Sequence, residues 1–355
     1  MRSLVLEDTR RLTWQEVPEP QRRHEREAIV RPLAVAACDL DQPMIFGHTP
    51  FQLPIHLGHE CVAEIVEGPE GFAPGERVVV PFQISCGTCE PCQRGMTGNC
   101  ATVSPLSMYG FGALGGEWGG MLSDLALVPY AEAMLVPLPE GVDPTVVASA
   151  ADNMPDGWRA VAPALAEVPA AEVLVVGGGG MRSIPLYAVD AALALGAASV
   201  TYVDTDAGRL AVAQRLGAQV IEGEPEPSLG AFPVTVDGTA RPDGLVATLR
   251  LTDWGGYCTS LGQLEPEAPL PLFELYTRGV HLHIGRAMAR PAIPAILDLV
   301  AAGRLRPQLV TSATVAWDDA PEALLEPATK LVINAPDRDD EPDPSPRSEI
   351  ERSAA

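Results

Sequence analysis

Residues 173–196 read VLVVGGGGMRSIPLYAVDAALALG. A short run rich in valine meets four glycines, and an alanine- and leucine-rich segment follows and ends at Gly196. The run predicts a buried strand and residues 186–195 predict a helix, because glycine is the common left-handed cap of a helix C-terminus. Strand, glycine turn and helix in this order are typical of a unit that binds a dinucleotide with its pyrophosphate at the helix N-terminus.

The chain downstream of this stretch repeats the alternation of strands and helices. We expect strands at 199–204, from 220 onward, at 234–237, 256–262 and 280–285, and a further helix at 209–216 that ends at Gly217. Strands that alternate with helices favour a doubly wound parallel sheet. Residues 153–285 are therefore predicted to form a Rossmann domain in an α/β protein.

The flanking segments have a different texture. Residues 28–35, 61–67 and 77–82 are short apolar runs between glycine and proline turns, so residues 1–152 are predicted to form a β-rich domain. A helix at 293–302 and strands at 312–316 and 330–333 are expected in a segment, 286–334, that returns to complete this first domain. Residues 335–355 are acidic and poor in apolar side chains, which predicts a disordered tail.

Composition limits the classes of partner. The formal net charge of the 355-residue chain is −23, which argues against nucleic acid because phosphate binding needs clustered lysine and arginine. Neither an apolar run of membrane-spanning length nor a secretory leader is apparent. We therefore expect a cytoplasmic protein without a membrane partner, in which the seven cysteines stay reduced and metal binding becomes their leading explanation.

Four of these cysteines lie within residues 86–100, in the segment CGTCEPCQRGMTGNC. Four thiolates on one short glycine-containing loop can surround a Zn²⁺ ion tetrahedrally and leave no open position, which is typical of a structural site. The predicted ligands are Cys86, Cys89, Cys92 and Cys100, in a zinc lobe at 84–102. Cys61 and Cys258 lie in apolar runs and are predicted to be core residues.

The cysteine segment, together with four other motifs, resembles the zinc-containing medium-chain alcohol dehydrogenases. The other motifs are Cys38-Asp-Leu-Asp41, Gly-His59-Glu60, Pro74-Gly-Glu-Arg-Val and a stretch around Asp152 that is similar to formaldehyde-dehydrogenase-like and polyol-dehydrogenase-like members. The resemblance covers residues 1 to about 334. It implies a GroES-like catalytic domain, a Rossmann domain, and a cleft between them that holds a second zinc.

The resemblance also assigns the ligands of that second zinc. A catalytic zinc takes about three protein ligands and keeps one open position. Cys38 and His59 match two ligand positions of the family, and Asp152 matches the third in its aspartate version. Asp41 is expected to orient the His59 ring, and Glu60 is the adjacent carboxylate that contacts the metal transiently or supports its ligands.

The glycine loop departs from the G-x-G-x-x-G pattern. Gly177, Gly179 and Gly180 are predicted to approach the pyrophosphate, but position 182 is arginine and Pro185 replaces the glycine that packs helix against strand. We expect Arg182 and Ser183 to add phosphate contacts. Asp204, at the end of the next strand, favours NAD over NADP because an acid there accepts from the ribose hydroxyls and repels a 2′-phosphate. Arg209 is expected to lie on the helix surface.

These features together predict a zinc-dependent oxidoreductase that transfers hydride between NAD and a small alcohol, polyol or aldehyde. Leu40 and Pro43 stand where the family has its proton relay, so the proton is expected to leave by water, Glu60 or another group. Trp118, Met154 and Trp158 are candidate pocket residues, as are His48 and His56. Two alternatives stay open: a dismutase-like member that retains its NAD, and a non-catalytic zinc-binding scaffold. The resemblance implies a homodimer or homotetramer.

Overall fold

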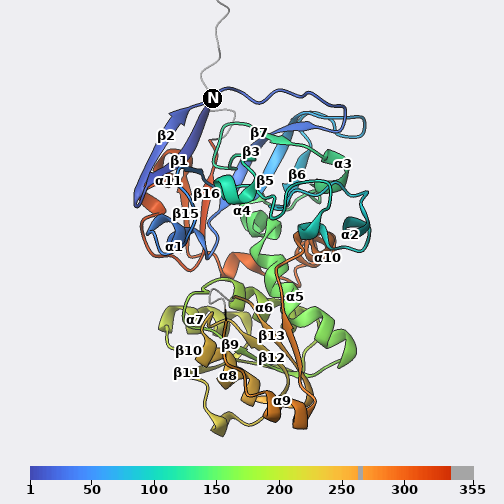
Figure 1. The fold of residues 1–355 in the computed structure, drawn as a ribbon, viewed down its shortest axis with the longest axis vertical. Helices are drawn as coiled ribbons and strands as arrows, with labels where there is room; N and C mark the ends of the chain where they lie inside the picture. The colour runs from blue at the N-terminus through green and yellow to red at the C-terminus, as the bar shows by residue number, and fades with distance from the viewer. Residues whose placement is uncertain (263–266, 337–355) are drawn as a thin grey trace, which may run out of the picture.

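The computed structural model describes residues 1–262 and 267–336. The predicted acidic tail therefore lies almost entirely outside the described residues. Two sheet-containing parts lie one above the other in Figure 1, with the N-terminal β-rich part at the top and the parallel-sheet part at the bottom. The long helix α5, Asn153–Glu167, runs from one part into the other.

The β-rich part is built around strand β3, Ala28–Ala36, which pairs with β5, Glu60–Glu67, and with β16, Leu331–Asn334, both antiparallel. The strand order of the larger sheet is β15-β16-β3-β5-β6-β8, and β7 also pairs with β3. β6 spans Arg77–Val80, β7 Ala126–Val128, β8 Val136–Pro137 and β15 Ala313–Ala316. Since β15 and β16 come from the end of the described chain, the C-terminal segment returns to the first domain as the sequence indicates.

A smaller sheet and several short helices complete this part. The strand order is β2-β1-β4, in which β1 spans Arg2–Asp8, β2 Arg11–Glu16 and β4 Ile55–His56. The short helices are α1, Asp41–Ile45; α2, Glu90–Gln93; α3, Ala131–Met134; α4, Pro144–Val147; and α11, Ala320–Ala323.

The second part is a six-stranded parallel sheet of order β11-β10-β9-β12-β13-β14. These strands span Gln219–Glu222, Ser199–Asp204, Glu172–Val176, Phe232–Asp237, Thr252–Ser260 and His281–Ile284. The helices α6, Ile184–Ala194; α7, Ala207–Leu216; α8, Pro242–Arg250; and α9, Leu272–Arg278, alternate with them. The fold is thus the predicted combination of a GroES-like domain with a doubly wound Rossmann-type sheet.

Burial explains why residues 173–176 form the central strand. All four side chains are at most 1% exposed, and the strand lies between β10 and β12, so both of its faces need apolar residues. Pro185 fits at the start of α6 because the residue packed against its ring, Gly238, has no side chain. A Cβ atom at Gly238 would lie 2.4 Å from Pro185 Cγ, so the close approach of helix and strand is provided from the strand side.

The two parts share one core. Val62 and Val79 of the β-rich sheet belong to the same buried cluster as α5, α6 and Ile293 of α10, Ala289–Ala301. Because apolar contacts continue across the junction, the relative placement of the two sheets is fixed by packing. Among the described residues, no helix combines the length and apolar character that crossing a membrane requires.

Candidate metal centres and nucleotide site

The fold brings together the four residues predicted for the second metal site. One ligand atom from each of Cys38, His59, Glu60 and Asp152 lies within 4.8 Å of those of the others. Cys38 follows β3, His59 and Glu60 stand at the start of β5, and Asp152 immediately precedes α5. The site therefore lies at the junction of the two domains, although Cys38 and Asp152 are 114 positions apart in the sequence.

Local backbone contacts hold this cluster in place. The backbone N–H of Cys38 donates to Asp41 Oδ2 at 2.8 Å, which turns the chain after β3. Gly58, immediately before His59, has φ +89°, and a Cβ atom there would lie 2.6 Å from the backbone nitrogen of Leu122. Only glycine suits this position, since it combines a left-handed φ with a close backbone approach.

The chemistry of the cluster fits a metal cation. The His59 ring is fully buried, yet neither of its nitrogens has a hydrogen-bond partner among the described residues, and Glu60 Oε2 also lacks one. Nε2 of His59 lies 3.4 Å from Asp152 Oδ2, and Nδ1 lies 3.7 Å from Asp41 Oδ1. Buried polar atoms without partners cost free energy, and a cation bound among thiolate, imidazole and carboxylate would satisfy them.

Electrostatics point the same way. Burial, and then the neighbouring Asp152 carboxylate, raise the pKa of the Cys38 thiol well above its ordinary value. Burial alone would lower the pKa of His59, but Asp41 and Asp152 raise it to about 9. Several acidic groups buried in one site are stabilised by a nearby positive charge. A bound metal ion would supply this charge and would also favour the deprotonated form of the Cys38 thiol.

Sequence reasoning missed Lys330, which supplies part of that charge. Its Nζ donates to Glu60 Oε1 at 2.8 Å, to the carbonyl oxygen of Ala37 at 2.7 Å and to Asn153 Oδ1 at 2.5 Å. Burial raises the pKa of Glu60 to about 8 even though Lys330 opposes the shift. The sequence did contain a signal, because Lys330 is the one lysine in a chain that otherwise uses arginine.

The four cysteines of the predicted zinc lobe also come together. Their sulfurs lie within 4.8 Å of one another in the chain between β6 and β7. Backbone N–H groups of Thr88 and Cys89 donate to Cys86 Sγ, both at 3.4 Å. Burial alone would raise the pKa of Cys86, but hydrogen bonds from Thr102 and Thr88 lower it to about 5. Four sulfurs gathered on one loop, with backbone donors to Cys86 Sγ, fit a closed tetrahedral metal site.

The predicted ribose acceptor, Asp204, is already engaged inside the chain. Its carboxylate accepts from Tyr202 Oη at 2.5 Å, from Arg209 Nε and Nη2 at 2.7 Å each, and from the backbone N–H of Gly178 at 3.2 Å. The prediction for Arg209 was wrong: it forms a two-pronged ion pair with Asp204 instead of lying free on the surface of α7. Burial opposes ionisation of Asp204, but the hydrogen bonds from Arg209 and Tyr202 lower its pKa overall.

The backbone N–H groups at the N-terminus of α6 are also hydrogen-bonded within the chain. Their acceptor is Asp39, which the sequence analysis did not predict to contact this helix. Asp39 accepts from the backbone N–H groups of Arg182 and Ser183 at 2.7 Å and 2.9 Å, and from that of Ile184 at 3.2 Å. The Ser183 hydroxyl also donates to it at 2.7 Å. Arg182 and Ser183 were expected to donate to a phosphate. In the structure they donate instead to a carboxylate of the first domain.

A cleft of about 350 Å³ opens beside the metal cluster. Asp152 and Phe82 from the first domain line it, together with Ser260 at the end of β13 and Arg286 after β14. The carboxyl ends of parallel strands are where doubly wound sheets bind ligands, so this cleft is the natural position for a substrate.

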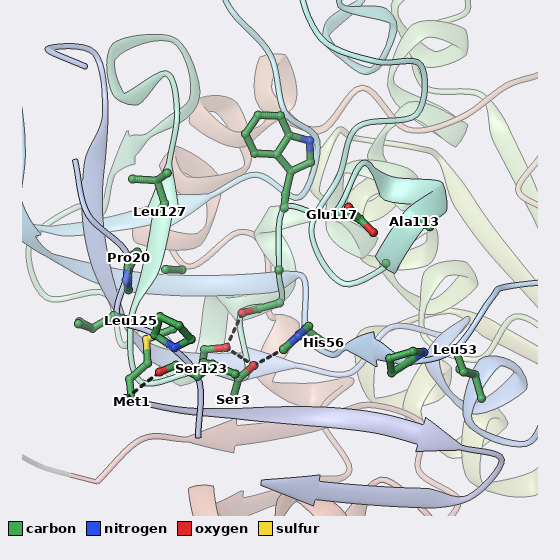
Figure 2. Close-up of a pocket in the computed structure, with 18 of the residues that line it drawn as sticks. Met1, Ser3, Pro20, Leu53, His56, Ala113, Glu117, Ser123, Leu125 and Leu127 are labelled. Atoms are coloured by element: carbon green, nitrogen blue, oxygen red, sulfur yellow. Dashed lines mark hydrogen bonds between the residues drawn. The ribbon is translucent and has the colours of Figure 1, made fainter. Parts of the chain in front are cut away.

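The candidate pocket residues lie elsewhere. Trp118 and His56 line a separate pocket of about 580 Å³ in the β-rich domain, where His56 points toward Ser3 and hydrogen-bonds to it at 2.8 Å (Figure 2). Met154 and Trp158 line a cavity of about 10 Å³ next to Asp190, and His48 is exposed. None of these residues lines the cleft beside Asp152. Cys61 and Cys258 are buried, as predicted.

Comparison with known proteins shows similarity to alcohol dehydrogenases. Residues 24–140 match the family model of the alcohol dehydrogenase GroES-like domain. A probable zinc-binding alcohol dehydrogenase of Mycobacterium tuberculosis is 28% identical over 332 residues, which cover 90% of this chain and 83% of that protein. Residues 24–140 thus carry the GroES-like domain of alcohol dehydrogenases, and the chain as a whole is similar to zinc-binding alcohol dehydrogenases.

Two further comparisons show how much of the chain is similar to known dehydrogenases. A glutathione-independent formaldehyde dehydrogenase of Pseudomonas aeruginosa is 32% identical over 226 residues, 61% of this chain, and the match spans only 55% of that enzyme. The solved structure of alcohol dehydrogenase TADH from Thermus sp. ATN1 superimposes with a TM-score of 0.85 at 28% identity, covering 95% of this chain and all of that one.

Proposed function

We propose that this protein is a zinc-dependent oxidoreductase that interconverts a small alcohol or polyol and the corresponding carbonyl compound with a nicotinamide cofactor. The observation that carries the proposal is the buried cluster of Cys38, His59 and Asp152 beside a cleft at the carboxyl edge of the Rossmann sheet. The similarity to zinc-binding alcohol dehydrogenases supports the reaction class. The substrate class and the cofactor are inferences from the site.

Cys38, His59 and Asp152 would hold the catalytic zinc, and the cleft leaves its open side to the substrate. When bound, the ion would supply Lewis acidity that favours the ionised form of an alcohol oxygen. The residues around it have distinct tasks. Asp41, whose Oδ1 lies 3.7 Å from Nδ1 of His59, would orient the ring electrostatically, and Asn153 Nδ2 donates to Cys38 Sγ at 3.3 Å, which stabilises the thiolate.

Glu60 is assigned a supporting task. Its Oε1 is held by Lys330, and its Oε2 remains without a partner within the described part of the chain, facing the metal cluster. Glu60 therefore balances the charge of the site and is available to exchange a proton, with water, in place of a hydroxyl relay. Leu40 offers no such group and packs beside Phe82, Met108 and Phe111.

Cys86, Cys89, Cys92 and Cys100 would hold a structural zinc, since the four sulfurs leave no position for a substrate. For the nicotinamide cofactor, we assign Gly177, Gly179 and Gly180 together with Arg182 and Ser183 to the pyrophosphate and Asp204 to the ribose. NAD is preferred over NADP in this assignment because Asp204 would repel a 2′-phosphate. A bound nicotinamide would supply the hydride acceptor in the cleft.

We also propose that the chain acts as a homodimer or homotetramer. Strand β14 is an edge strand of the parallel sheet, and large apolar side chains near that edge are exposed, among them Phe273 at 78% and Tyr276 at 83%. Exposed apolar patches next to an unpaired strand edge favour self-association. We place the protein in the cytoplasm because its cysteines are unpaired and suited to metal binding.

A substrate screen tests the proposed activity. Protein purified without chelator is assayed with small primary alcohols, polyols and aldehydes in the presence of NAD⁺, NADP⁺ and their reduced forms. We expect turnover of at least one compound and its loss in Cys38→Ser, while Cys258→Ser, which changes a buried thiol outside the cluster, stays active. Turnover that survives in Cys38→Ser would overturn the assignment. A folded protein with both metals and no turnover would favour the scaffold alternative.

A further inference from the structure

An acidic side chain of the catalytic domain lies at the N-terminus of the first Rossmann helix. Asp39, the residue after Cys38, is 6% exposed and accepts three backbone N–H bonds and one hydroxyl bond from residues 182–184. These contacts join positions that are 143 to 145 residues apart in the chain. They form a direct polar link between the loop that carries a metal ligand and the segment that leads from the glycines into α6.

The position matters because of what a Rossmann fold normally binds there. The free N–H groups at the N-terminus of the helix after the glycine loop, and the positive end of the helix dipole, bind the pyrophosphate of a dinucleotide. α6 has 11 residues and begins at Ile184, with three residues between it and the glycine run that ends at Gly180, so its N-terminus is the corresponding place in this chain. The Asp39 carboxylate is itself an anion and uses the same donors.

The remainder of the nucleotide site is engaged in a similar way. The N–H of Gly178 donates to Asp204, and that of Gly180 donates to the carbonyl oxygen of Thr239 at 3.3 Å. A nucleotide therefore cannot gain these hydrogen bonds without replacing existing ones. Asp39 differs from the other two acceptors because it comes from the other domain. Asp204 is also a carboxylate, but it is paired with Arg209 within the Rossmann part.

We propose that Asp39 is an internal competitor for the pyrophosphate, and that the dinucleotide binds only after Asp39 has left the N-terminus of α6. The inference rests on the proposed nicotinamide cofactor and adds a step to its binding. Since Asp39 adjoins Cys38, its release also moves the metal-binding loop. Nucleotide binding and the geometry of the metal cluster are thereby coupled through one side chain.

Titration of the zinc-loaded protein with NADH and NADPH tests the competition. Dissociation constants are compared for the wild type, Asp39→Asn and Asp39→Ala, and for Asp143→Asn as a control. Asp143 is also a helix-capping aspartate, but it caps α4 in the β-rich domain. We expect both Asp39 variants to bind NADH about tenfold more tightly, because a charged helix-terminus contact no longer competes. The control should bind like the wild type.

Hydrogen exchange at the amides of residues 182–184 provides a readout that is independent of catalysis. They should be protected in the nucleotide-free wild type, exposed in Asp39→Ala, and protected again when NADH is added to that variant. A merely structural role of Asp39 would give no recovery on adding NADH. Circular dichroism and zinc content establish that each variant is folded.

The outcomes separate this inference from the proposed function. Equal dissociation constants in all variants, or weaker binding in the Asp39 variants that retain their fold and zinc, would overturn the competition and leave the cofactor assignment in place. No binding of NADH or NADPH by any variant at millimolar concentration would overturn both.

Discussion

Lys330 Nζ lies 2.8 Å from Glu60 Oε1, and both side chains are fully buried. The pair joins the residue immediately before β16 to the first residue of β5, across 270 positions of sequence. The same ammonium group also satisfies Ala37 and Asn153, so one side chain stabilises three segments that surround the metal cluster. The metal site therefore depends on the C-terminal segment being folded onto the first domain.

Replacing Lys330 by Met should destabilise the protein by about 3–5 kcal/mol, because a buried carboxylate loses its opposite charge and two further acceptors lose their donor. The double variant Glu60→Gln/Lys330→Met should recover part of this loss, since it leaves no buried charge unpaired. Urea denaturation monitored by circular dichroism measures both effects.

A matched control is the exposed pair Arg94–Glu90, whose side chains are each 70% exposed. Arg94→Met should change the free energy of unfolding by less than about 1 kcal/mol. Equal effects of Lys330→Met and Arg94→Met would show that the buried pair is not the structural link described here.

Replacing Cys92 by Ala should remove one zinc ion per chain and lower the free energy of unfolding by several kcal/mol, because a structural metal contributes its binding energy to folding. Elemental analysis and thermal denaturation give the two values. The control is Cys258→Ala, which deletes a thiol of similar burial from β13 and should keep both metals. A Cys92→Ala protein that retained both zinc ions would disprove the four-cysteine site.

Ionisation of the buried Asp190 carboxyl should lower the free energy of unfolding as the pH rises. Its carboxyl is 1% exposed, Oδ2 accepts from the backbone N–H of Arg306 at 2.7 Å, and Oδ1 has no partner in the described part of the chain. Burial raises the pKa of Asp190 to about 6. Since an unfolded aspartate titrates near pH 3.9, the native state binds the extra proton between about pH 4 and pH 6, and stability declines across this window.

Asp190→Asn removes that titration. From pH 4 to pH 7 the variant should gain about 2–3 kcal/mol relative to the wild type, as two pKa units correspond to roughly that free energy. Denaturation curves at several pH values measure the difference, with Asp143→Asn, an exposed helix cap, as the comparison. A difference that does not change with pH would contradict the account of Asp190.

The elements predicted from local sequence agree with the structure because their signals are local. Valines 173, 175 and 176 are buried on both faces of a central strand, and Gly217 ends α7 in the left-handed conformation. The spacing of residues 86–100 likewise places four sulfurs on one short loop. Such features depend on neighbours a few residues away, which a sequence displays directly.

The contacts that escaped prediction are those made between distant segments. Asp39 on α6 and Lys330 on Glu60 each join residues more than 140 positions apart, so their partners are set by how the domains pack. Arg209 is a local exception, because it lies only five positions from Asp204. A surface arginine and an ion-paired one look alike in sequence, and the turn between β10 and α7 brings its guanidinium to Asp204.

The central claim is a second zinc held by Cys38, His59 and Asp152, and metal content tests it most directly. Zinc per chain is measured in the wild type, in Asp152→Asn, and in Asp156→Asn as a control, because Asp156 is equally buried at the start of the same helix but is paired with Arg159. The account predicts two zinc ions in the wild type and the control, and one in Asp152→Asn. One zinc in the wild type, or two tightly held in Asp152→Asn, would contradict it.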